Sequence, residues 1–305
     1  FVLAGLMALL IVVIYILEKG PSDTAKGIFV HTVKETSRMG FVAEMFLSKE
    51  EVDEIMNTGG IIEIEDHETN DTDLINTDDI KEEEKADITF EEVSGVSFKG
   101  YLLTIRDPGR VFCGTIPQFG NFDGMRVIDM IDTYNAAGDN VLGGVNGGDF
   151  VDMGSYSYTA QPLGAIISNG EVAYCADTYD TPYHLSGFTY DNKFFMGNIS
   201  VNEAIAMGVR DAVYTVHNTG PFLVMDGVAL INEVPDSATY GGGKNPRTAI
   251  GQRSDGSVIL LVVDGRQANS LGATFKDLAY IMLEYGAVNA CAMDGGTSSQ
   301  MVYSG

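Results

Sequence analysis

The sequence contains little positive charge for its size. Its 305 residues include 18 Lys and Arg against 43 Asp and Glu, so the formal net charge is −25. A surface of this sign repels nucleic acid, and we exclude DNA or RNA partners. Much of the excess is local, because residues 63–92 hold 14 acidic and 2 basic side chains. The rest of the chain is only moderately acidic, and a pocket in it can still be cationic.

Cysteine and histidine are scarce and unfavourably spaced for a disulfide framework or a zinc site. The three cysteines, Cys113, Cys175 and Cys291, form no C-x-x-C pair, and each stands in an apolar run. Buried, inert thiols are the simplest interpretation of such a pattern. The four histidines show no metal-ligand spacing.

The longest apolar run stands at the beginning of the chain. Residues 1–17 carry no charge, and this length is at the lower limit for a membrane span. No small-x-small cleavage site follows. We therefore expect a single-pass anchor helix with the rest of the chain outside the cell; secretion after signal cleavage is the alternative.

Three further regions follow the apolar run. Residues 18–62 have the pattern of a juxtamembrane helical segment, to which the sequence assigns no chemistry. Residues 63–89 form an acidic tract with little apolar content, most simply a solvated linker. Residues 90–305 are expected to form the globular domain.

The domain has the pattern of an α+β fold, with a mixed β-sheet core and flanking helices. The buried strand Ser257–Val263 ends at Asp264, and Thr274 caps a helix that is followed by a second strand ending at Asp294. This β-α-β order predicts two strands that run in the same direction and carry both aspartates to one edge of the sheet. Turn residues predict hairpins over residues 100–115 and 162–177.

Five short motifs follow one another after residue 145. They are Asn146–Phe150 (NGGDF), Pro246–Gly251 (PRTAIG), Asp264–Arg266 (DGR), Ser270–Thr274 (SLGAT) and Asn289–Ser298 (NACAMDGGTS). The last of them places a carboxylate at a strand end, beside small residues whose backbone amides can approach a ligand closely. Such an arrangement suits a polar or phosphorylated substrate.

In this order the motifs resemble those of the phosphodiester glycosidase domain family, the family of N-acetylglucosamine-1-phosphodiester α-N-acetylglucosaminidase. Many of its bacterial members carry the label "exopolysaccharide biosynthesis protein". The family pattern is NGG-x-F, PRT-x-x-G, DGR, S-x-G-x-T and NLDGG-x-S. Here Ala292 and Met293 replace the usual Asn-Leu, and Thr297 stands where glycine is common. The resemblance implies a hydrolase that cleaves the C1–O bond of a sugar-1-phosphodiester in an extracellular or cell-surface glycan.

This reaction expels a phosphate monoester, so the site must neutralise a phosphate and stabilise an oxocarbenium-like transition state. Arginine suits the first task because its planar fork grips phosphate with two hydrogen bonds. The expected catalytic residues are Asp264, Asp294, Arg247 and Arg266; which aspartate attacks is left open. The expected substrate-binding residues are Asn146, Gly147, Gly148, Thr248, Gly295, Gly296, Thr297 and Ser298.

Several alternatives to this interpretation remain open. No cofactor is required, although Asp149 and Asp152 are weaker candidates for binding a divalent cation. The aspartates in the motifs have a plainer interpretation as caps of turns. A different glycoside hydrolase on the same scaffold, or a non-catalytic glycan-binding or exopolysaccharide-assembly protein, is also compatible with the motifs.

Overall fold

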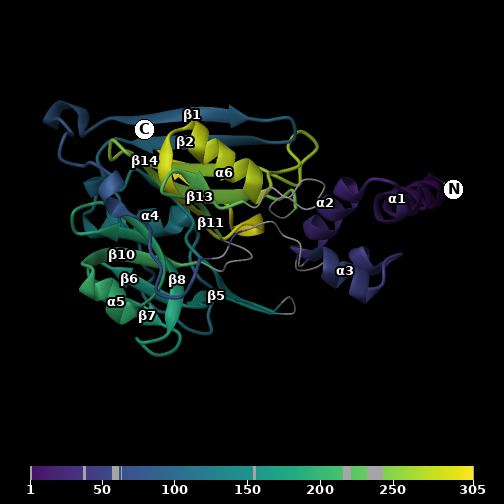
Figure 1. The fold of residues 1–305 in the computed structure, drawn as a ribbon, viewed down its shortest axis with the longest axis horizontal. Coiled ribbons are helices and arrows are strands. Elements are labelled where there is room, and N and C mark those ends of the chain that lie inside the picture. The colour runs from purple at the N-terminus through teal and green to yellow at the C-terminus, as the bar shows by residue number, and fades with distance from the viewer. Residues whose placement is uncertain are drawn as a thin grey trace.

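The computed structural model describes residues 2–36, 39–56, 62, 64–153, 156–215, 221–231 and 243–304. An N-terminal group of helices stands to one side of a β-rich body (Figure 1). The group consists of α1 (Val2–Lys19), α2 (Asp23–Lys34), the 3₁₀ helix η1 (Gly40–Glu44) and α3 (Lys49–Met56).

The larger sheet of the body has seven strands. In spatial order they are β1 (Ile88–Ser94), β2 (Lys99–Ile105), β14 (Val258–Val263), β13 (Arg247–Arg253), β15 (Ala287–Ala292), β11 (Phe222–Met225) and β12 (Val228–Ala229). One face is covered by α6 (Phe275–Glu284), whose Phe275, Leu278 and Met282 are fully buried against the sheet. The α6 face and the sheet therefore enclose one hydrophobic core.

A second sheet packs on the opposite face. Its order is β7 (Glu171–Cys175), β6 (Ala165–Ser168), β10 (Val209–Tyr214), β8 (Pro182–Thr189) and β9 (Phe194–Ser200). Leu103 and Leu260 of the larger sheet share a cluster with Phe188 and Phe194 of the second, so the two sheets form a sandwich. The short helix α5 (Val201–Ala206) covers the outer side of the second sheet.

Two small strand pairs and several short helices complete the body. The pairs are β3 (Gly143–Val145) with β16 (Met301–Tyr303) and β4 (Phe150–Asp152) with β5 (Ser157–Pro162). The remaining helices are α4 (Val127–Ala137), η2 (Thr72–Leu74), η3 (Glu82–Glu84), η4 (Pro108–Arg110) and η5 (Gly296–Ser298).

The α+β class is confirmed, and so are the main local predictions. Strand β14 ends at Val263, and α6 begins with a capping box between Thr274 and Asp277. β14 and β15 run in the same direction, as predicted, but β13 lies between them and is antiparallel to both. The predicted mixed sheet is wrong in one respect, because every strand pairing among the described residues is antiparallel. Since β14 and β15 run in the same direction, the two aspartates still lie at one edge of the sheet, with β13 between their strands.

The two predicted hairpins had different outcomes. β6 and β7 are joined through Asn169 and Gly170, both at positive φ, as an Asn-Gly turn requires. The hairpin over residues 100–115 is wrong. β2 instead pairs with the preceding β1, and the Asp107 side chain caps η4 by accepting from the Gly109 amide. The turn exists, but residues 111–115 leave the sheet and pass along a cavity.

The described part of the acidic tract is not a free linker. Ile75 is 1% exposed and belongs to the core between the two sheets. Asn70 donates to the Phe194 carbonyl at 3.1 Å and accepts from the Met196 amide at 2.6 Å. The acidic side chains of η2 and η3 lie outside the core, whereas Asn70 and Ile75 of the same tract contact the domain. An acidic composition therefore did not prevent this tract from packing on the domain. The boundary at residue 90 stays a prediction.

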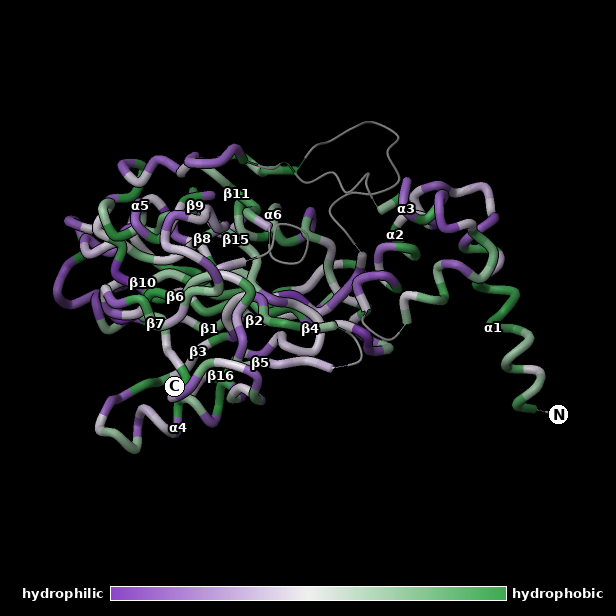
Figure 2. Tube along the Cα trace, turned by 90° about the horizontal axis from the view of Figure 1, so that it is seen from below, coloured by the Kyte–Doolittle hydropathy of each residue, from purple (hydrophilic) through white to green (hydrophobic). Residues whose placement is uncertain are grey.

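Helix α1 is long and apolar enough to cross a membrane, by length and composition. Most of its side chains are exposed, and Figure 2 shows it as a mainly hydrophobic helix that points away from the body. A signal sequence passes the same test, so the helix agrees with either an anchor or a signal.

Candidate active site

The loop Asp294–Ser298 after β15 is held from two sides by backbone hydrogen bonds. The Asp294 amide donates to the Gly147 carbonyl at 3.1 Å, and the Gly296 amide donates to the Pro246 carbonyl at 2.9 Å. Gly296 has a φ of +63°, which favours glycine. The NGG and PRT motifs therefore meet at the DGG motif, as the sequence predicts.

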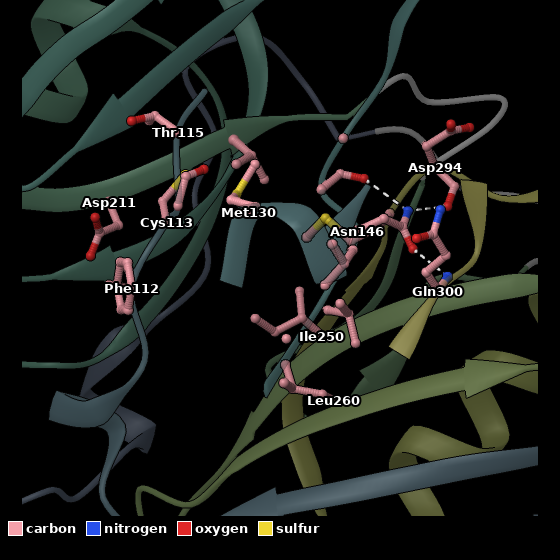
Figure 3. A pocket seen from close by; sticks show the side chains of 18 of the residues that line it. Phe112, Cys113, Thr115, Met130, Asn146, Asp211, Ile250, Leu260, Asp294 and Gln300 are labelled. Carbon is pink, nitrogen blue, oxygen red and sulfur yellow. Dashed lines mark hydrogen bonds between the residues drawn. The ribbon is translucent and has the colours of Figure 1, made fainter. Parts of the chain in front are cut away.

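Asn146 connects these three motifs through its side-chain amide. Its Nδ2 donates to the carbonyls of Asp294 at 2.8 Å and Gly147 at 3.2 Å. Its Oδ1 accepts from the Thr248 hydroxyl at 2.8 Å and from the Gln300 amide at 3.1 Å. Figure 3 shows Asn146 between Asp294 and Gln300. An amide has two donor and two acceptor positions, and all four are used within the protein. Asn146 and Thr248 thus position the loop in this structure, and the substrate contact expected of them stays a prediction.

A cavity of about 870 Å³ opens beside this loop. Its polar side includes Asn146, Asp149, Asp294 and Thr297, together with Gly147, Gly148, Asp152 and Ser298. Its lining also includes apolar side chains such as Met130, Ile250 and Leu260, and Figure 3 shows Asp211 and Thr115 on the side away from Asp294. The cavity thus offers both polar and apolar side chains to a ligand.

Asp294 is partly buried at the polar edge of this cavity. Burial, then the negative charge of Asp149 and more weakly that of Asp152, raises the pKa of Asp294 to about 7, against the opposing effect of hydrogen bonds from Ser298 and Gly295. Near neutral pH the carboxyl group is therefore present in both protonation states. Such a group can act as a proton acceptor or donor at physiological pH.

The carboxylate with the larger effect on the pKa of Asp294 is Asp149, and Asp264 is not among the causes of the shift. Asp149 is 8% exposed, lines the same cavity and also contributes, after burial, to the raised pKa of Tyr214. Asp264 follows β14; its amide donates to the Lys99 carbonyl at 2.8 Å, and its carbonyl accepts from the Ser270 hydroxyl at 2.7 Å. The structure records no side-chain hydrogen bond or ion pair between Asp264 and any described residue, and its catalytic role stays a prediction.

The two arginines lie together on the other side of the Gly295–Gly296 turn. A Cβ atom built on Gly295 would lie 3.6 Å from Arg247 Nη1, and one built on Gly296 would lie 3.3 Å from Arg266 Nη2. Burial, then the charge of Arg247, lowers the pKa of Arg266. Two guanidinium groups that repel each other in a partly buried place form a site for an anion.

This anion site is occupied by a side chain of the N-terminal helices, Glu35. Arg247 Nη2 donates to Glu35 Oε2 at 2.6 Å, and Asn245 Nδ2 donates to the same oxygen at 2.8 Å. The Gly243 amide donates to Oε1 at 2.8 Å. Burial alone would raise the pKa of Glu35, but Arg247, with His31 and Gly243, lowers it to about 2. We call Gly243, Asn245, Arg247 and Arg266 the arginine pocket.

Arg247 and Arg266 are held in place by different contacts. Arg247 is 4% exposed; its Nη2 donates to the Gly243 carbonyl at 2.9 Å, and its guanidinium lies 3.8 Å from the centre of the Phe275 ring. Arg266 has a φ of +57° and donates to Asn245 Oδ1 at 3.0 Å and to the Thr36 hydroxyl at 3.2 Å. The site residues expected from the sequence did not include Gly243, Asn245 or Glu35, and Glu35 has no motif signal of its own.

No group of three or more His, Cys, Asp or Glu side chains that could hold a metal ion occurs among the described residues. Asp149 and Asp152 do lie near each other at the cavity edge. Their binding of a divalent cation stays a prediction.

Comparison with known proteins identifies the family of the chain. A family model for phosphodiester glycosidases matches residues 139–305, more than half of the chain. The chain belongs to the phosphodiester glycosidase family. Its structure is similar to the catalytic domain of zebrafish N-acetylglucosamine-1-phosphodiester α-N-acetylglucosaminidase, auto-inhibited by its pro-peptide, with a TM-score of 0.56, 21% identity and 78% of each chain covered. At that identity the likeness shows the fold.

Other similarities are more distant or shorter. A hypothetical protein from Synechocystis matches with a TM-score of 0.46, 14% identity and coverage of 71% of this chain and 58% of that one. A putative exported protein from Burkholderia pseudomallei has a TM-score of 0.44 and 16% identity, over 68% and 69% of the two chains. An uncharacterised prophage-derived protein of Bacillus subtilis, YomE, is 48% identical over 62 residues, which are 20% of this chain and 10% of YomE.

Proposed function

We propose that this member of the phosphodiester glycosidase family hydrolyses the C1–O bond of a sugar-1-phosphodiester, such as an N-acetylglucosamine-1-phosphodiester. The observation that carries the proposal is the arginine pocket. This pocket holds the Glu35 carboxylate, and it lies next to the loop that carries Asp294, whose carboxyl group titrates near neutrality. Arg247 contacts Glu35 at 2.6 Å, and the Asp294 pKa is about 7. A phosphodiester carries the same single charge as the glutamate that now occupies the pocket.

The leaving group decides what the carboxylate must do. A phosphate monoester is a weak base and departs with little help from an acid. The protein then has to neutralise the phosphate with Arg247 and Arg266 and to activate water or attack C1 with a carboxylate. A base works best when its pKa is near the operating pH. Asp294 meets this condition, because burial and then the charge of the neighbouring Asp149 raise its pKa to about 7.

We further propose that the substrate is a phosphorylated glycan at the cell surface. The apolar helix α1 supports an anchor that holds the domain at the outer face of a membrane. In this setting, polymers that contain sugar-1-phosphodiester links, of the teichoic-acid or capsular type, are the substrate class within reach. Exopolysaccharide modification is the corresponding process, and secretion after cleavage of α1 is the alternative.

The test is release of a phosphate monoester from a panel of sugar-1-phosphodiesters by the full chain in detergent. We expect Asp294→Asn to lower kcat by about 10²–10⁴-fold, the range for loss of a positioned proton-transfer group. Arg247→Lys keeps the charge but loses the planar fork, and kcat/KM should fall about 10–100-fold. Asp132→Asn, an exposed carboxylate on α4, is the matched control and should behave like the wild type.

Comparing Asp149→Asn with Asp264→Asn identifies the second carboxylate. We expect the larger loss for Asp149→Asn, because Asp149 lines the same cavity as Asp294 and its charge helps to raise the pKa of Asp294. A larger loss for Asp264→Asn would instead support the assignment made from the DGR motif. If the wild type cleaves no diester while glycan still binds, the chain is a glycan-binding module.

A further inference from the structure

A short segment between α2 and α3 exposes three large apolar side chains. Met39 is 47% exposed, Phe41 68% and Met45 42%, and all three lie in or beside η1. Apolar residues that are exposed singly are common on soluble proteins, but several together mark a contact with another surface. We call Met39, Phe41 and Met45 the apolar patch.

Other residues of the same segment already fill the core of the N-terminal helices. Ala43 is fully buried and Leu47 is 6% exposed, and both pack with Val30 of α2 and Val52 of α3. This core is therefore complete without the patch. Phe41 stands two positions before Ala43 and remains mostly exposed, so its ring is available to a surface outside the chain.

Three contacts fix this segment against the last turns of α1. The rings of Tyr15 and Phe46 meet edge to face, with their centres 5.3 Å apart. The Phe46 amide donates to Glu18 Oε2 at 2.8 Å. Lys19 Nζ lies 3.2 Å from Glu51 Oε1 of α3. The position of the segment along the axis of α1 is therefore set by the structure.

These contacts are made at the level where the apolar run of α1 ends. Residues 1–17 carry no charge, and Glu18 and Lys19 are the first charged residues of the chain. Tyr15 lies about 6 Å before Lys19 along the helix axis, at 1.5 Å per residue. A tyrosine near the end of a span is typical of the boundary between hydrocarbon and headgroups. When α1 is inserted in a bilayer, Phe46 therefore lies at this boundary, and the neighbouring apolar patch lies beside it.

The charge of the segment also suits a lipid surface. Between residues 39 and 47 the sequence has one charged residue, Glu44, and it pairs with Lys34 of α2. The chain as a whole has a net charge of −25, which anionic headgroups repel. Contact with a membrane must therefore come from apolar side chains, which bind a bilayer by entering the region between headgroups and acyl chains.

We propose that the apolar patch inserts into the interface of the bilayer beside α1, so that lipid is the partner of this surface. The inference goes beyond the glycosidase reaction and rests on the anchor role proposed for α1. The N-terminal helices then touch the membrane through the span and through the patch, which restricts their orientation. The end of α2 contacts Arg247 and Arg266, so the arginine pocket lies on the side of the body that faces these helices and the membrane.

The first experiment uses tryptophan fluorescence, because the sequence contains no tryptophan and one substitution supplies a unique probe. Phe41→Trp is made in the full chain and reconstituted into phosphatidylcholine vesicles with and without brominated lipid. We expect brominated lipid to quench at least half of its emission. The matched control is Tyr190→Trp, because Tyr190 is 64% exposed and lies beside the turn between β6 and β7 of the body. Its emission should be unchanged by brominated lipid and lie at longer wavelength.

A second variant and a second measurement examine the same contact. Met45→Trp places the probe on another side chain of the patch and should be quenched as well; it replaces Phe41→Trp if that variant fails to fold. Amide hydrogen exchange is then compared between the wild type and Phe41→Ser in unlabelled vesicles. We expect exchange over residues 40–45 to be at least tenfold faster in Phe41→Ser, whereas exchange in α6 should be unchanged.

Sedimentation with the vesicles separates failure of the inference from failure of the anchor. Protein that sediments with vesicles while both patch probes are no more quenched than Tyr190→Trp contradicts the membrane contact and leaves the anchor standing. Protein that stays in the supernatant contradicts the anchor and the membrane contact together. Quenching of the patch probes in sedimented protein supports both. Cleavage of a sugar-1-phosphodiester is measured separately, so failure of the glycosidase does not change any of these readouts.

Discussion

At the scale of single residues, the coupling between Asp149 and Asp294 predicts how activity depends on pH. Burial, followed by the charge of Asp149, raises the pKa of Asp294 to about 7. If ionised Asp294 is the working base, kcat/KM rises as the pH passes through about 7 and then levels off. Asp149→Asn removes a negative charge, so Asp294 ionises at lower pH and the rise moves in the same direction. A kcat/KM profile between pH 5 and pH 9 measures both midpoints.

The control for this profile is Asp132→Asn, which removes an exposed charge that does not line the cavity and should leave the midpoint unchanged. An equal midpoint in Asp149→Asn would show that the two carboxylates do not interact. Activity that falls as the pH rises through 7 would assign the working role to the protonated form of Asp294.

Residue types and their order predicted where several of these residues lie, but not which side chains they contact. The PRT, DGR and DGG motifs place Arg247, Arg266 and Asp294 near one sheet edge, and the structure confirms that placement. The partner of Asp294 depends on how the NGG loop folds over β10. Glu35 is one of 43 acidic residues, and its contact with Arg247 arises from docking of a remote helix, for which the sequence carries no local signal.

At the scale of structural elements, the loop between β3 and β4 depends on one close backbone approach. A Cβ atom on Gly148 would lie 1.7 Å from the Tyr214 carbonyl oxygen of β10, whereas one on Gly147 meets nothing within 4 Å. Gly148→Ala must therefore push the loop off β10, and we expect it to lower the free energy of unfolding by about 1–3 kcal/mol. Gly147→Ala should cost less than about 0.5 kcal/mol. Urea unfolding of both variants measures the difference.

The same loop carries Asn146, so its displacement should also reach the site. Gly148→Ala is expected to lower kcat as well, since Asn146 binds the Asp294 carbonyl and would move with the loop. Equal free energies of unfolding in the two alanine variants would contradict the close contact between Gly148 and β10. Glycines in the NGG motif predict a close approach from sequence alone, but which glycine makes it, and against which strand, follows only from the packing of the two sheets.

At the scale of the whole molecule, the hydrophobic clusters predict where the chain can be divided. The N-terminal helices have their own core of Val30, Ala43, Leu47 and Val52. The acidic tract that follows contributes Ile75 to the core between the sheets, at 1% exposure. A chain that begins at residue 62 should therefore unfold cooperatively with the stability of the full domain, whereas one that begins at Ile88 should lose about 2–5 kcal/mol or more, the usual cost of emptying a core position.

Two neighbouring substitutions test the same point without truncation. Ile75→Ala removes a fully buried side chain and should cost about 2–5 kcal/mol, while Leu74→Ala removes one that is 43% exposed and should cost far less. Equal costs would mean that the acidic tract is a solvated linker, as its composition predicts. The charge of residues 63–92 is compatible with docking because the acidic side chains face solvent while Asn70 and Ile75 make the inward contacts. Composition describes the outer face of such a segment, and its few inward residues determine where it lies.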